Sequence, residues 1–265
     1  MTRILHLYWD CNQPLSFLRS LTVTSFARLH PDWQIKVWVP KERNEKEHQW
    51  ATGEQSKKYK GPDYLETISQ YLCSVDFNKL QIPNDMPAVH KADLLRWYLL
   101  GTAGGVWSDF DILYVKALPD IPPGVGLCRY KALPNSDRLF TVIGFLTSQD
   151  SYGKQFFNEL FQFGLSHIPQ SAYQAYGAML LDEFITRPAT FAPVFYICPE
   201  WVYPHKNSAA YFRPFGLQKQ NVIGYHWYAG SPLAGEHEVK INHENIIFKA
   251  NQYAICKVAM EEVLS

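Results

Sequence analysis

Residues 90–111 constrain the fold more than any other stretch of this chain, because four structural signals follow one another there. Apolar side chains recur at helical spacing in its first half, which predicts a helix. Glycines follow, and glycine commonly ends a helix because it adopts positive φ at no steric cost. A short apolar strand is expected next, and Asp109 and Asp111 come where that strand ends. The glycines that predict the helix end are Gly101, Gly104 and Gly105.

Asp109 and Asp111 are separated by one residue, a spacing that has a direct chemical meaning. In an extended segment alternate side chains share one face, so both carboxylates can point at the same place. Two hard oxygen ligands suit Mg²⁺ or Mn²⁺ and leave coordination positions open for phosphate groups. The alternative is a solvated turn with two carboxylates. The apolar, aromatic and glycine residues on either side favour the metal site.

Asp93 and Arg96 lie three residues apart on the predicted helix and therefore share one of its faces. One interpretation is an ion pair on the helix surface, which contributes little to stability. The neighbouring positions are almost wholly apolar, however, and a buried charge requires a partner. A guanidinium group also suits phosphate oxygens and vicinal hydroxyls. We therefore favour a functional role for this pair over a surface ion pair.

The first forty residues predict a strand, a helix and a second strand. Residues 4–9 form a short apolar run, residues 15–26 carry an apolar stripe after Pro14, and residues 34–39 alternate. Consecutive strands joined by a helix pair in parallel with a right-handed crossover. We therefore expect an α/β fold, Rossmann-like, with a mostly parallel central sheet and flanking helices.

Residues 41–62 contain a run of mixed charges and few apolar residues. Apolar residues recur at helical spacing over residues 64–72. We expect these two segments to form a helical insertion or lid. The remaining elements follow from the same patterns. Further strands are predicted at residues 112–115, 126–130, 139–147, 194–199, 201–204 and 222–231. Helices are predicted at residues 152–163 and 172–185 and at the end of the chain. No linker or repeat divides the chain, so a single domain over residues 1–265 is expected.

Charge and cysteine content limit the classes of function. The chain has 25 Lys and Arg against 25 Asp and Glu, so its near-zero net charge argues against a nucleic-acid partner. Its five cysteines are odd in number and lack Cys-x-x-Cys spacing, which indicates reduced thiols in a reducing compartment. The first residues lack the long apolar region of a signal peptide or membrane anchor, so we expect a cytoplasmic protein without a transmembrane segment.

The run Asp93-x-x-Arg96, Gly104-Gly105-x-Trp107-x-Asp109-x-Asp111 resembles the DXD-containing sugar transferases. This group includes the Golgi α-1,6-mannosyltransferases, the bacterial capsular polysaccharide transferases and the catalytic domains of the large glucosylating toxins. The resemblance implies a GT-A fold, a nucleotide-diphosphate sugar as donor, Mn²⁺ or Mg²⁺, and transfer to a saccharide or glycoconjugate acceptor with retention at the anomeric carbon. It also implies a nucleotide-binding half at about residues 1–118 and an acceptor half with a C-terminal cap at about residues 119–265.

The resemblance further implies roles for individual residues. Asp93 and Asp109 would accept hydrogen bonds from sugar hydroxyls, and Arg96 would contact the donor sugar or its phosphate. The expected metal ligands are Asp109, Asp111 and His226. Two further positions are implied to contact the nucleotide sugar, Trp9 by stacking on the base and Ser231 by touching the β-phosphate, and His6 is expected to be structural.

The second motif, residues 222–231, departs from the family pattern. His226 is followed at once by Trp227, and Pro232 stands where the last tryptophan is expected. The expected catalytic residues are nevertheless Asp93, Arg96, Asp109 and Asp111.

Three other functions are compatible with parts of the sequence. Paired carboxylates with Mg²⁺ also serve phosphohydrolases and nucleotidyltransferases, but those enzymes need further carboxylates around the metal and no second acidic cluster is evident. A carbohydrate- or nucleotide-binding module without catalysis is a second alternative, and the intact acidic and basic motif argues against it. A sugar transferase acting on modified DNA bases is the third, and the neutral charge disfavours it.

Overall fold

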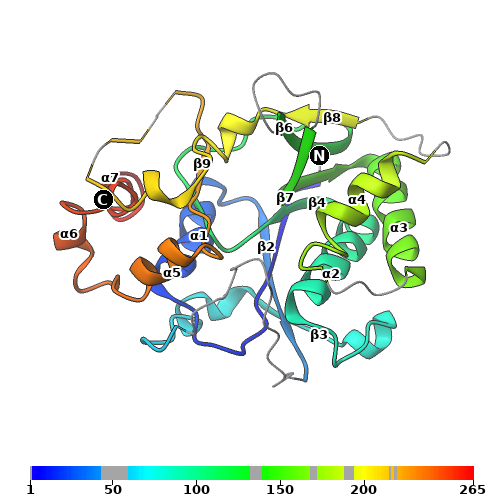
Figure 1. Cartoon of the computed structure of the whole chain (residues 1–265), viewed down its shortest axis with the longest axis horizontal. Helices are drawn as coiled ribbons and strands as arrows, with labels where there is room; N and C mark the ends of the chain where they lie inside the picture. The colour runs from blue at the N-terminus through cyan, green and yellow to red at the C-terminus, as the bar shows by residue number, and fades with distance from the viewer. Residues whose placement is uncertain are drawn as a thin grey trace.

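The computed structural model describes residues 2–42, 59–131, 139–167, 172–187, 194–214, 216–217 and 220–265. A seven-stranded sheet in the order β3-β2-β1-β4-β7-β6-β8 crosses the molecule, and β5 and β9 form a separate two-stranded sheet (Figure 1). The strands of the large sheet are β1 Ile4–Tyr8, β2 Gln34–Pro40, β3 Leu72–Val75, β4 Gly105–Ser108, β6 Gly124–Lys131, β7 Leu139–Gln149 and β8 Val194–Ile197. Those of the small sheet are β5 Ile112–Tyr114 and β9 Gly224–His226.

Helices flank these sheets on both sides (Figure 1). The α-helices are α1 Phe17–Leu29, α2 Ala88–Thr102, α3 Asp150–Ser166, α4 Ala178–Ile185, α5 Pro232–Glu238, α6 Ile246–Lys249 and α7 Ala254–Glu262. The short 3₁₀ helices are η1 Glu66–Tyr71, η2 Phe77–Leu80, η3 Pro199–Trp201 and η4 Ser208–Ala210. None of the helices in these described ranges combines the length and the apolar character that crossing a membrane requires.

The predicted α/β fold with a mostly parallel sheet is confirmed. β3, β2, β1 and β4 run parallel, and β8 runs parallel to β6. The antiparallel strand is β7, which pairs with both β4 and β6. The predicted unit β1-α1-β2 opens the chain, and its helix is capped by Ser16, whose side chain accepts a hydrogen bond from the Arg19 amide.

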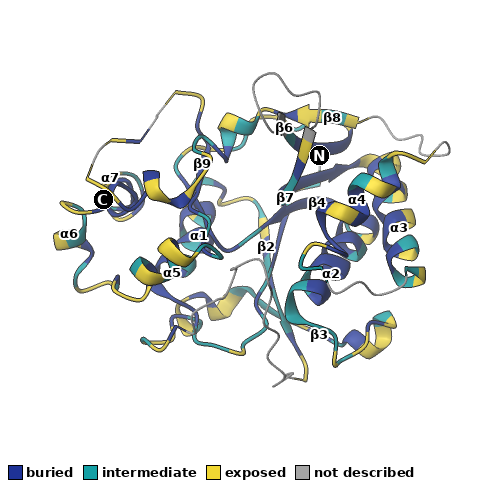
Figure 2. Cartoon of the chain, in the orientation of Figure 1, coloured by how far each residue is buried: buried dark blue, intermediate teal, exposed yellow. Residues whose placement is uncertain are grey.

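Successive side chains along each strand point to opposite faces of the sheet, so an apolar core forms on each face. Trp107 and Leu146 pack with α2, α3 and α4, whereas their neighbours Val106 and Phe145 pack with α1 on the opposite face. A third core joins the C-terminal helices α5 and α7 to α1 across β9. The central strands and α2 are accordingly the most deeply buried elements, and exposed residues lie on the outer helices (Figure 2).

Gly101 has a different role from the predicted one. It lies inside α2, which continues to Thr102, and a Cβ at this position would come within 2.5 Å of the Asn158 backbone nitrogen on α3. Glycine is therefore required here for close helix packing. The predicted positive φ occurs instead at Gly104 and Gly105, with φ of 72° and 98°.

Four other local predictions were wrong in part. Residues 201–204 do not form a strand, because η3 and a turn occupy this place. The helix predicted at residues 172–185 begins only at Ala178, after a series of turns. The helical spacing over residues 64–72 gives the 3₁₀ helix η1, and Leu72 already belongs to β3. The strand predicted at residues 222–231 is limited to β9, Gly224–His226, and the helix α5 follows from Pro232. Most of the insertion predicted at 41–62 (residues 43–58) lies outside the described residues.

Candidate active site

The two aspartates of the Asp-x-Asp motif lie between β4 and β5, at the carboxyl end of a strand in the parallel part of the sheet. Phe110 between them is buried and meets Trp9 edge-on, with ring centroids 5.6 Å apart. The backbone is fixed on both sides, since the Asp109 amide donates to Gly144 O at 2.8 Å and the Trp227 amide donates to Asp111 O at 2.9 Å. The motif is thus held between β7 and the segment after β9.

A chain of polar contacts connects α2 to the first aspartate. Arg96 donates from Nη1 to Asp93 Oδ1 at 2.9 Å and from Nη2 to Asp109 Oδ1 at 3.1 Å. Trp107 Nε1 donates to the same Asp109 oxygen at 2.9 Å, and the guanidinium lies 4.7 Å from a Trp107 ring centroid. Asp93 and Arg96 are 2% and 4% exposed, so the interpretation as a surface ion pair is excluded.

Burial dominates the electrostatics of Asp93. Loss of hydration raises the pKa of Asp93 to about 7, although Arg96 lowers it, and the nearby charge of Asp109 raises it further. Asp93 uses Oδ1 to bind Arg96, while a Cβ at Gly177 would lie 2.8 Å from Asp93 Oδ2. Gly177 therefore lets the backbone lie close to the second carboxylate oxygen, where a larger residue would collide with it.

The second aspartate is paired with His226 through the small sheet. Ile112 of β5 is in register with His226 of β9, which brings His226 Nε2 within 3.1 Å of Asp111 Oδ1. The Ala229 amide donates to Asp111 Oδ2 at 2.7 Å. Burial opposes the ionised state of both groups, but their mutual attraction prevails, lowering the pKa of Asp111 and raising the pKa of His226.

Asp109, Asp111 and His226 lie together in a way that fits a divalent cation. Each offers a ligand atom, and these atoms lie within 4.8 Å of one another. Among the described residues His226 Nδ1 is buried without a hydrogen-bond partner, which leaves a nitrogen lone pair or proton unused. Two carboxylates and an imidazole are a ligand set that Mn²⁺ accepts. The structure thus brings together the three residues that the sequence predicted as metal ligands.

Trp9, at the end of β1, is placed beside the motif through its contact with Phe110. Its indole is 7% exposed, the Arg19 guanidinium lies 5.2 Å from a ring centroid, and Nε1 donates to Gln13 O. Arg19 in turn binds Glu238 of α5 at 2.7 Å, a link between the two halves of the chain. The predicted stacking of Trp9 on a base therefore remains a prediction.

Ser231 is the N-cap of α5, where its Oγ accepts a hydrogen bond from the Ala234 amide and bonds to Ser208 Oγ at 2.8 Å. It lies two residues after Ala229, which binds Asp111. His6 is structural as expected, since it is fully buried and bonds to Gly104 O and to Trp38. Contact of Ser231 with a phosphate remains a prediction.

Sequence reasoning missed three residues that border the aspartates. Gly144 and Gly177 lie close to Asp109 and Asp93, since a Cβ at either glycine would come within 2.8 Å of the Oδ2 atom, and Tyr203 packs on His226. Gly144 lies within a strand pattern and Gly177 in a stretch predicted as helix, and an isolated glycine in a strand often marks close approach of another group. The Tyr203 segment was expected to be a strand, and no spacing in it pointed to the site.

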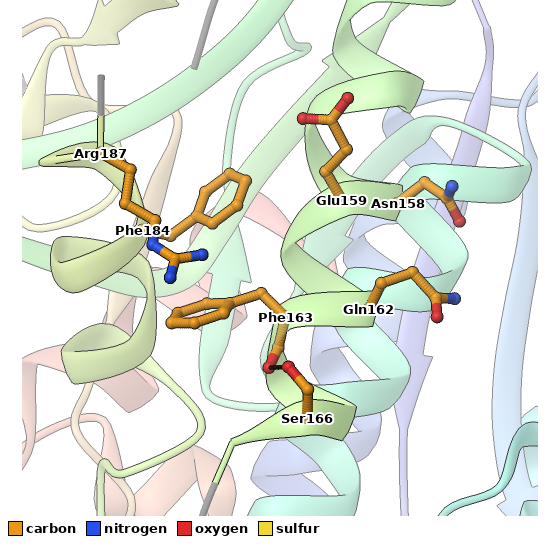
Figure 3. Close-up of a pocket in the computed structure, with 7 residues that line it drawn as sticks. All are labelled: Asn158, Glu159, Gln162, Phe163, Ser166, Phe184 and Arg187. Atoms are coloured by element: carbon orange, nitrogen blue, oxygen red, sulfur yellow. Dashed lines mark hydrogen bonds between the residues drawn. The ribbon is translucent and has the colours of Figure 1, made fainter. Parts of the chain in front are cut away.

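A hollow of about 430 Å³ lies on the outer surface between α3 and α4 (Figure 3). The guanidinium of Arg187 covers the Phe163 ring there, with Cζ 4.1 Å from the ring centroid. The lining residues are Asn158, Glu159, Gln162, Phe163, Ser166, Phe184 and Arg187. None of them belongs to the site around the two aspartates, so this hollow is a separate surface feature.

The fold and the site together define a class of protein: an α/β domain that holds an Asp-x-Asp pair at the end of a parallel strand, with a buried Asp-Arg pair behind it. The model of the family described as "Glycosyltransferase sugar-binding region containing DXD motif" matches residues 18–125. This region is less than half of the chain, and it contains the complete motif from Asp93 to Asp111. The resemblance found in the sequence is thus confirmed over this region, which matches the sugar-binding region of DXD glycosyltransferases.

Solved structures of glycosyltransferases align with the chain at low identity. PaToxG glycosyltransferase aligns at 15% identity and a TM-score of 0.48, over 70% of this chain and 69% of that one. The galactosyltransferase LgtC, in complex with donor and acceptor sugar analogs, aligns at 12% identity and a TM-score of 0.45, over 93% of this chain and 99% of that one. The ligand-free glycosyltransferase domain of the YGT toxin aligns at 12% identity and a TM-score of 0.39, over 93% of this chain and 79% of that one. At these TM-scores the likenesses assign neither substrate nor mechanism. No curated protein matches the chain.

Proposed function

We propose that the protein transfers a hexose from a UDP- or GDP-linked sugar to a hydroxyl of a saccharide acceptor, with Mn²⁺ or Mg²⁺ bound and with retention at the anomeric carbon. The observation that carries this proposal is the cluster of Asp109, Asp111 and His226, whose ligand atoms lie within 4.8 Å of one another. The buried pair of Asp93 and Arg96 adjoins the same cluster.

Asp111 and His226 would hold the cation, with Asp109 beside them. Already fixed by Ala229 and by the β5–β9 ladder, Asp111 needs little reorganisation to serve as a ligand. When bound, the cation supplies neutralisation of the charge that develops on the nucleoside diphosphate as the glycosidic bond breaks. Arg96 adds a positive charge that is buried together with the carboxylates of Asp93 and Asp109, where electrostatic interactions are weakly screened.

The donor sugar would lie in front of Asp93 and Asp109. Arg96 occupies the Oδ1 atom of both carboxylates, and in the described residues no hydrogen bond reaches either Oδ2 atom. In this proposal sugar hydroxyls donate to these two Oδ2 atoms, which lie next to Gly177 and Gly144. Two carboxylate oxygens at fixed positions select a ligand with several hydroxyl groups. In the same proposal Trp9 stacks on the base and Ser231 touches the β-phosphate.

Retention is the outcome that the resemblance to the DXD-containing sugar transferases implies. Asp93 and Asp109 are bound through Oδ1 by Arg96, and Asp111 is bound by His226 and Ala229; in this proposal all three bind the donor or the cation and do not attack the sugar. The acceptor hydroxyl would attack the anomeric carbon on the face that the diphosphate leaves. The bond from the anomeric carbon to the phosphate oxygen breaks, the bond to the acceptor oxygen forms, and a donor phosphate oxygen takes the proton.

A phosphohydrolase or nucleotidyltransferase fits the site less well. Within the part of the chain that the structure describes, the ligand cluster contains two carboxylates and one histidine. Phosphoryl-transfer sites with two metal ions use additional carboxylates to hold the second ion. The two glycine-bordered carboxylate oxygens have no evident use in phosphate hydrolysis, whereas a sugar donor uses both.

Hydrolysis of a panel of UDP- and GDP-sugars with Mn²⁺ tests this function. We expect release of one nucleoside diphosphate by the wild type and by Asp120→Asn, a variant of an exposed aspartate. We expect the activity of the Asp111→Asn variant to be at least about a hundredfold lower than that of the wild type, a typical effect of removing a group that stabilises charge in an active site. Product analysis with an acceptor then gives the anomeric configuration. Absence of turnover with every donor, together with absence of metal-dependent nucleotide binding, would indicate a binding module instead.

A further inference from the structure

Tyr203 lies outside both the Asp-x-Asp motif and the region matched by the family model, which ends at residue 125. Its backbone is nevertheless tied to the site. The Tyr203 amide donates to Pro199 O at 2.7 Å, and the preceding carbonyl, Val202 O, accepts from the His226 amide at 2.9 Å. The segment that carries Tyr203 is therefore anchored to β9, the strand that carries His226.

The ring of Tyr203 packs on the imidazole of His226. The two ring centroids are 4.7 Å apart with an angle of 40° between the planes, and Tyr228 meets the same imidazole edge-on at 4.6 Å. Tyr203 is 7% exposed, so its ring is fixed by surrounding side chains. Packed rings on a histidine restrict its rotation, and the orientation of a metal-binding imidazole depends on such contacts.

The hydroxyl of Tyr203 is buried and, among the described residues, has no hydrogen-bond partner. A buried polar group without a partner costs about 1–3 kcal/mol, so such a group usually has a function or an absent partner. A Cβ added at Gly144 would lie 2.7 Å from this hydroxyl and 2.8 Å from Asp109 Oδ2. The Tyr203 hydroxyl and Asp109 Oδ2 therefore border the same space beside β7.

Asp109 supplies the complementary group. Its Oδ1 accepts hydrogen bonds from Arg96 and Trp107, whereas its Oδ2 accepts none among the described residues. A donor without an acceptor and an acceptor without a donor thus both lie next to Gly144. One tyrosine contacts His226 through its ring and adjoins Asp109 through its hydroxyl, and these are two of the three candidate metal ligands.

We propose that Tyr203 is a positioning residue of the metal site: its ring orients His226, and its hydroxyl donates a hydrogen bond to Asp109 Oδ2 when the site is loaded. This inference rests on the proposed metal-dependent function and extends it to a residue outside the motif. A hydrogen bond to Oδ2 fixes the rotation of the Asp109 carboxylate, which otherwise is held through Oδ1 alone. Outer-shell hydrogen bonds of this kind contribute about 10–100-fold to metal affinity.

The proposal is tested by titrating the full chain with Mn²⁺, with and without UDP or GDP. The spectroscopic signal of free Mn²⁺ reports how much of the ion is bound. Tyr203→Phe removes the hydroxyl and keeps the ring, and Tyr203→Leu removes both. Tyr211→Phe is the matched control, because Tyr211 is also buried with an unpartnered hydroxyl among the described residues, and its ring contacts Tyr225 and Tyr228. Thermal unfolding of each variant confirms that it is folded.

We expect Tyr203→Phe to weaken Mn²⁺ binding about tenfold, Tyr203→Leu to weaken it further, and Tyr211→Phe to leave it within about twofold of the wild type. If Asp111→Asn abolishes binding while Tyr203→Phe binds as tightly as the wild type, the metal site stands and the role of Tyr203 is wrong. Equal losses in Tyr203→Phe and Tyr211→Phe would also overturn that role. If the wild type binds no Mn²⁺ with either nucleotide, the proposed function itself fails.

Discussion

The guanidinium of Arg96 lies 2.9 Å from the carboxylate of Asp93, and both side chains are buried on the same face of α2. Arg96 also reaches Asp109 across the site at 3.1 Å. One residue therefore neutralises a buried acid and positions the first aspartate of the Asp-x-Asp motif. Stability and the geometry of the candidate site depend on the same side chain, so a substitution here should affect both.

Replacement of Arg96 by methionine tests this dependence. Arg96→Met leaves Asp93 buried without its partner, and breaking a buried pair in this way costs about 3–5 kcal/mol of folding free energy. Urea unfolding gives this value directly. The double variant Asp93→Asn with Arg96→Met recovers part of the loss, because the unpaired charge is gone. Lys257→Met, in the exposed pair with Glu261, is the control and changes stability by less than about 1 kcal/mol. A similar small change for Arg96→Met would contradict the structural argument.

Gly177→Ala tests the proposed sugar pocket. A Cβ at this position would lie 2.8 Å from Asp93 Oδ2 and 2.6 Å from Ile143 Cδ1, so it fills the space proposed for a sugar hydroxyl. We expect KM for the nucleotide sugar to rise about tenfold, which corresponds to the loss of one hydrogen bond. Inhibition by the free nucleoside diphosphate, which lacks the sugar, should not change.

Gly235→Ala is the control for this experiment, because a Cβ at Gly235 would meet nothing within 4 Å. Gly235→Ala should leave both the KM for the nucleotide sugar and the inhibition by the free nucleoside diphosphate unaltered. An equal weakening of the nucleotide sugar and of the free diphosphate by Gly177→Ala would instead place this glycine near the phosphates.

Gly101→Ala probes the contact between α2 and α3. The new methyl group would meet the backbone of Asn158 at 2.5 Å, and backbone cannot move aside as a flexible side chain can. Overpacking at such a site costs about 1–3 kcal/mol, which thermal unfolding detects as a lowered Tm. Gly235→Ala, also within a helix, should be neutral or slightly stabilising because alanine has the higher helix propensity. A Gly101→Ala protein as stable as the wild type would show that the helices can separate freely.

His6 predicts a pH dependence of stability. Burial lowers the pKa of His6 to about 4 in the folded protein, against 6.5 for the free side chain. The Trp38 indole donates to Nδ1 and Nε2 bonds to Gly104 O, so the neutral ring satisfies both contacts. The unfolded chain binds the proton first as pH falls, and the contribution of His6 is fully present above pH 6.5 and lost between pH 6.5 and about 4.

The expected loss across this window is about 3 kcal/mol, from the size of the pKa shift. Urea unfolding of the wild type and of His6→Gln at several pH values measures this loss. The free energy of unfolding should fall more steeply with falling pH in the wild type, because the other titrating groups are common to both proteins. Parallel pH profiles for the two proteins would show that His6 does not carry this dependence.

Local sequence alone determined much of this protein. The unit β1-α1-β2, the helix α2, the glycines before β4 and the position of the Asp-x-Asp pair all follow from short-range patterns: helical and strand periodicity, a proline near a helix start, and residues that tolerate positive φ. The buried state of Asp93 and Arg96 was also predictable, because their neighbours are apolar. Each of these features depends on residues within a few positions of one another.

Only the tertiary structure decided how distant segments meet. The antiparallel insertion of β7, the pairing of β5 with β9 and the approach of Tyr203 to His226 join residues far apart in the chain, and no local pattern encodes such contacts. Gly101 shows the same limit, since its sequence context fits a helix end equally well as a helix contact. Local propensities specify elements, whereas the geometry of the site arises from long-range packing that places Asp111 and His226 3.1 Å apart.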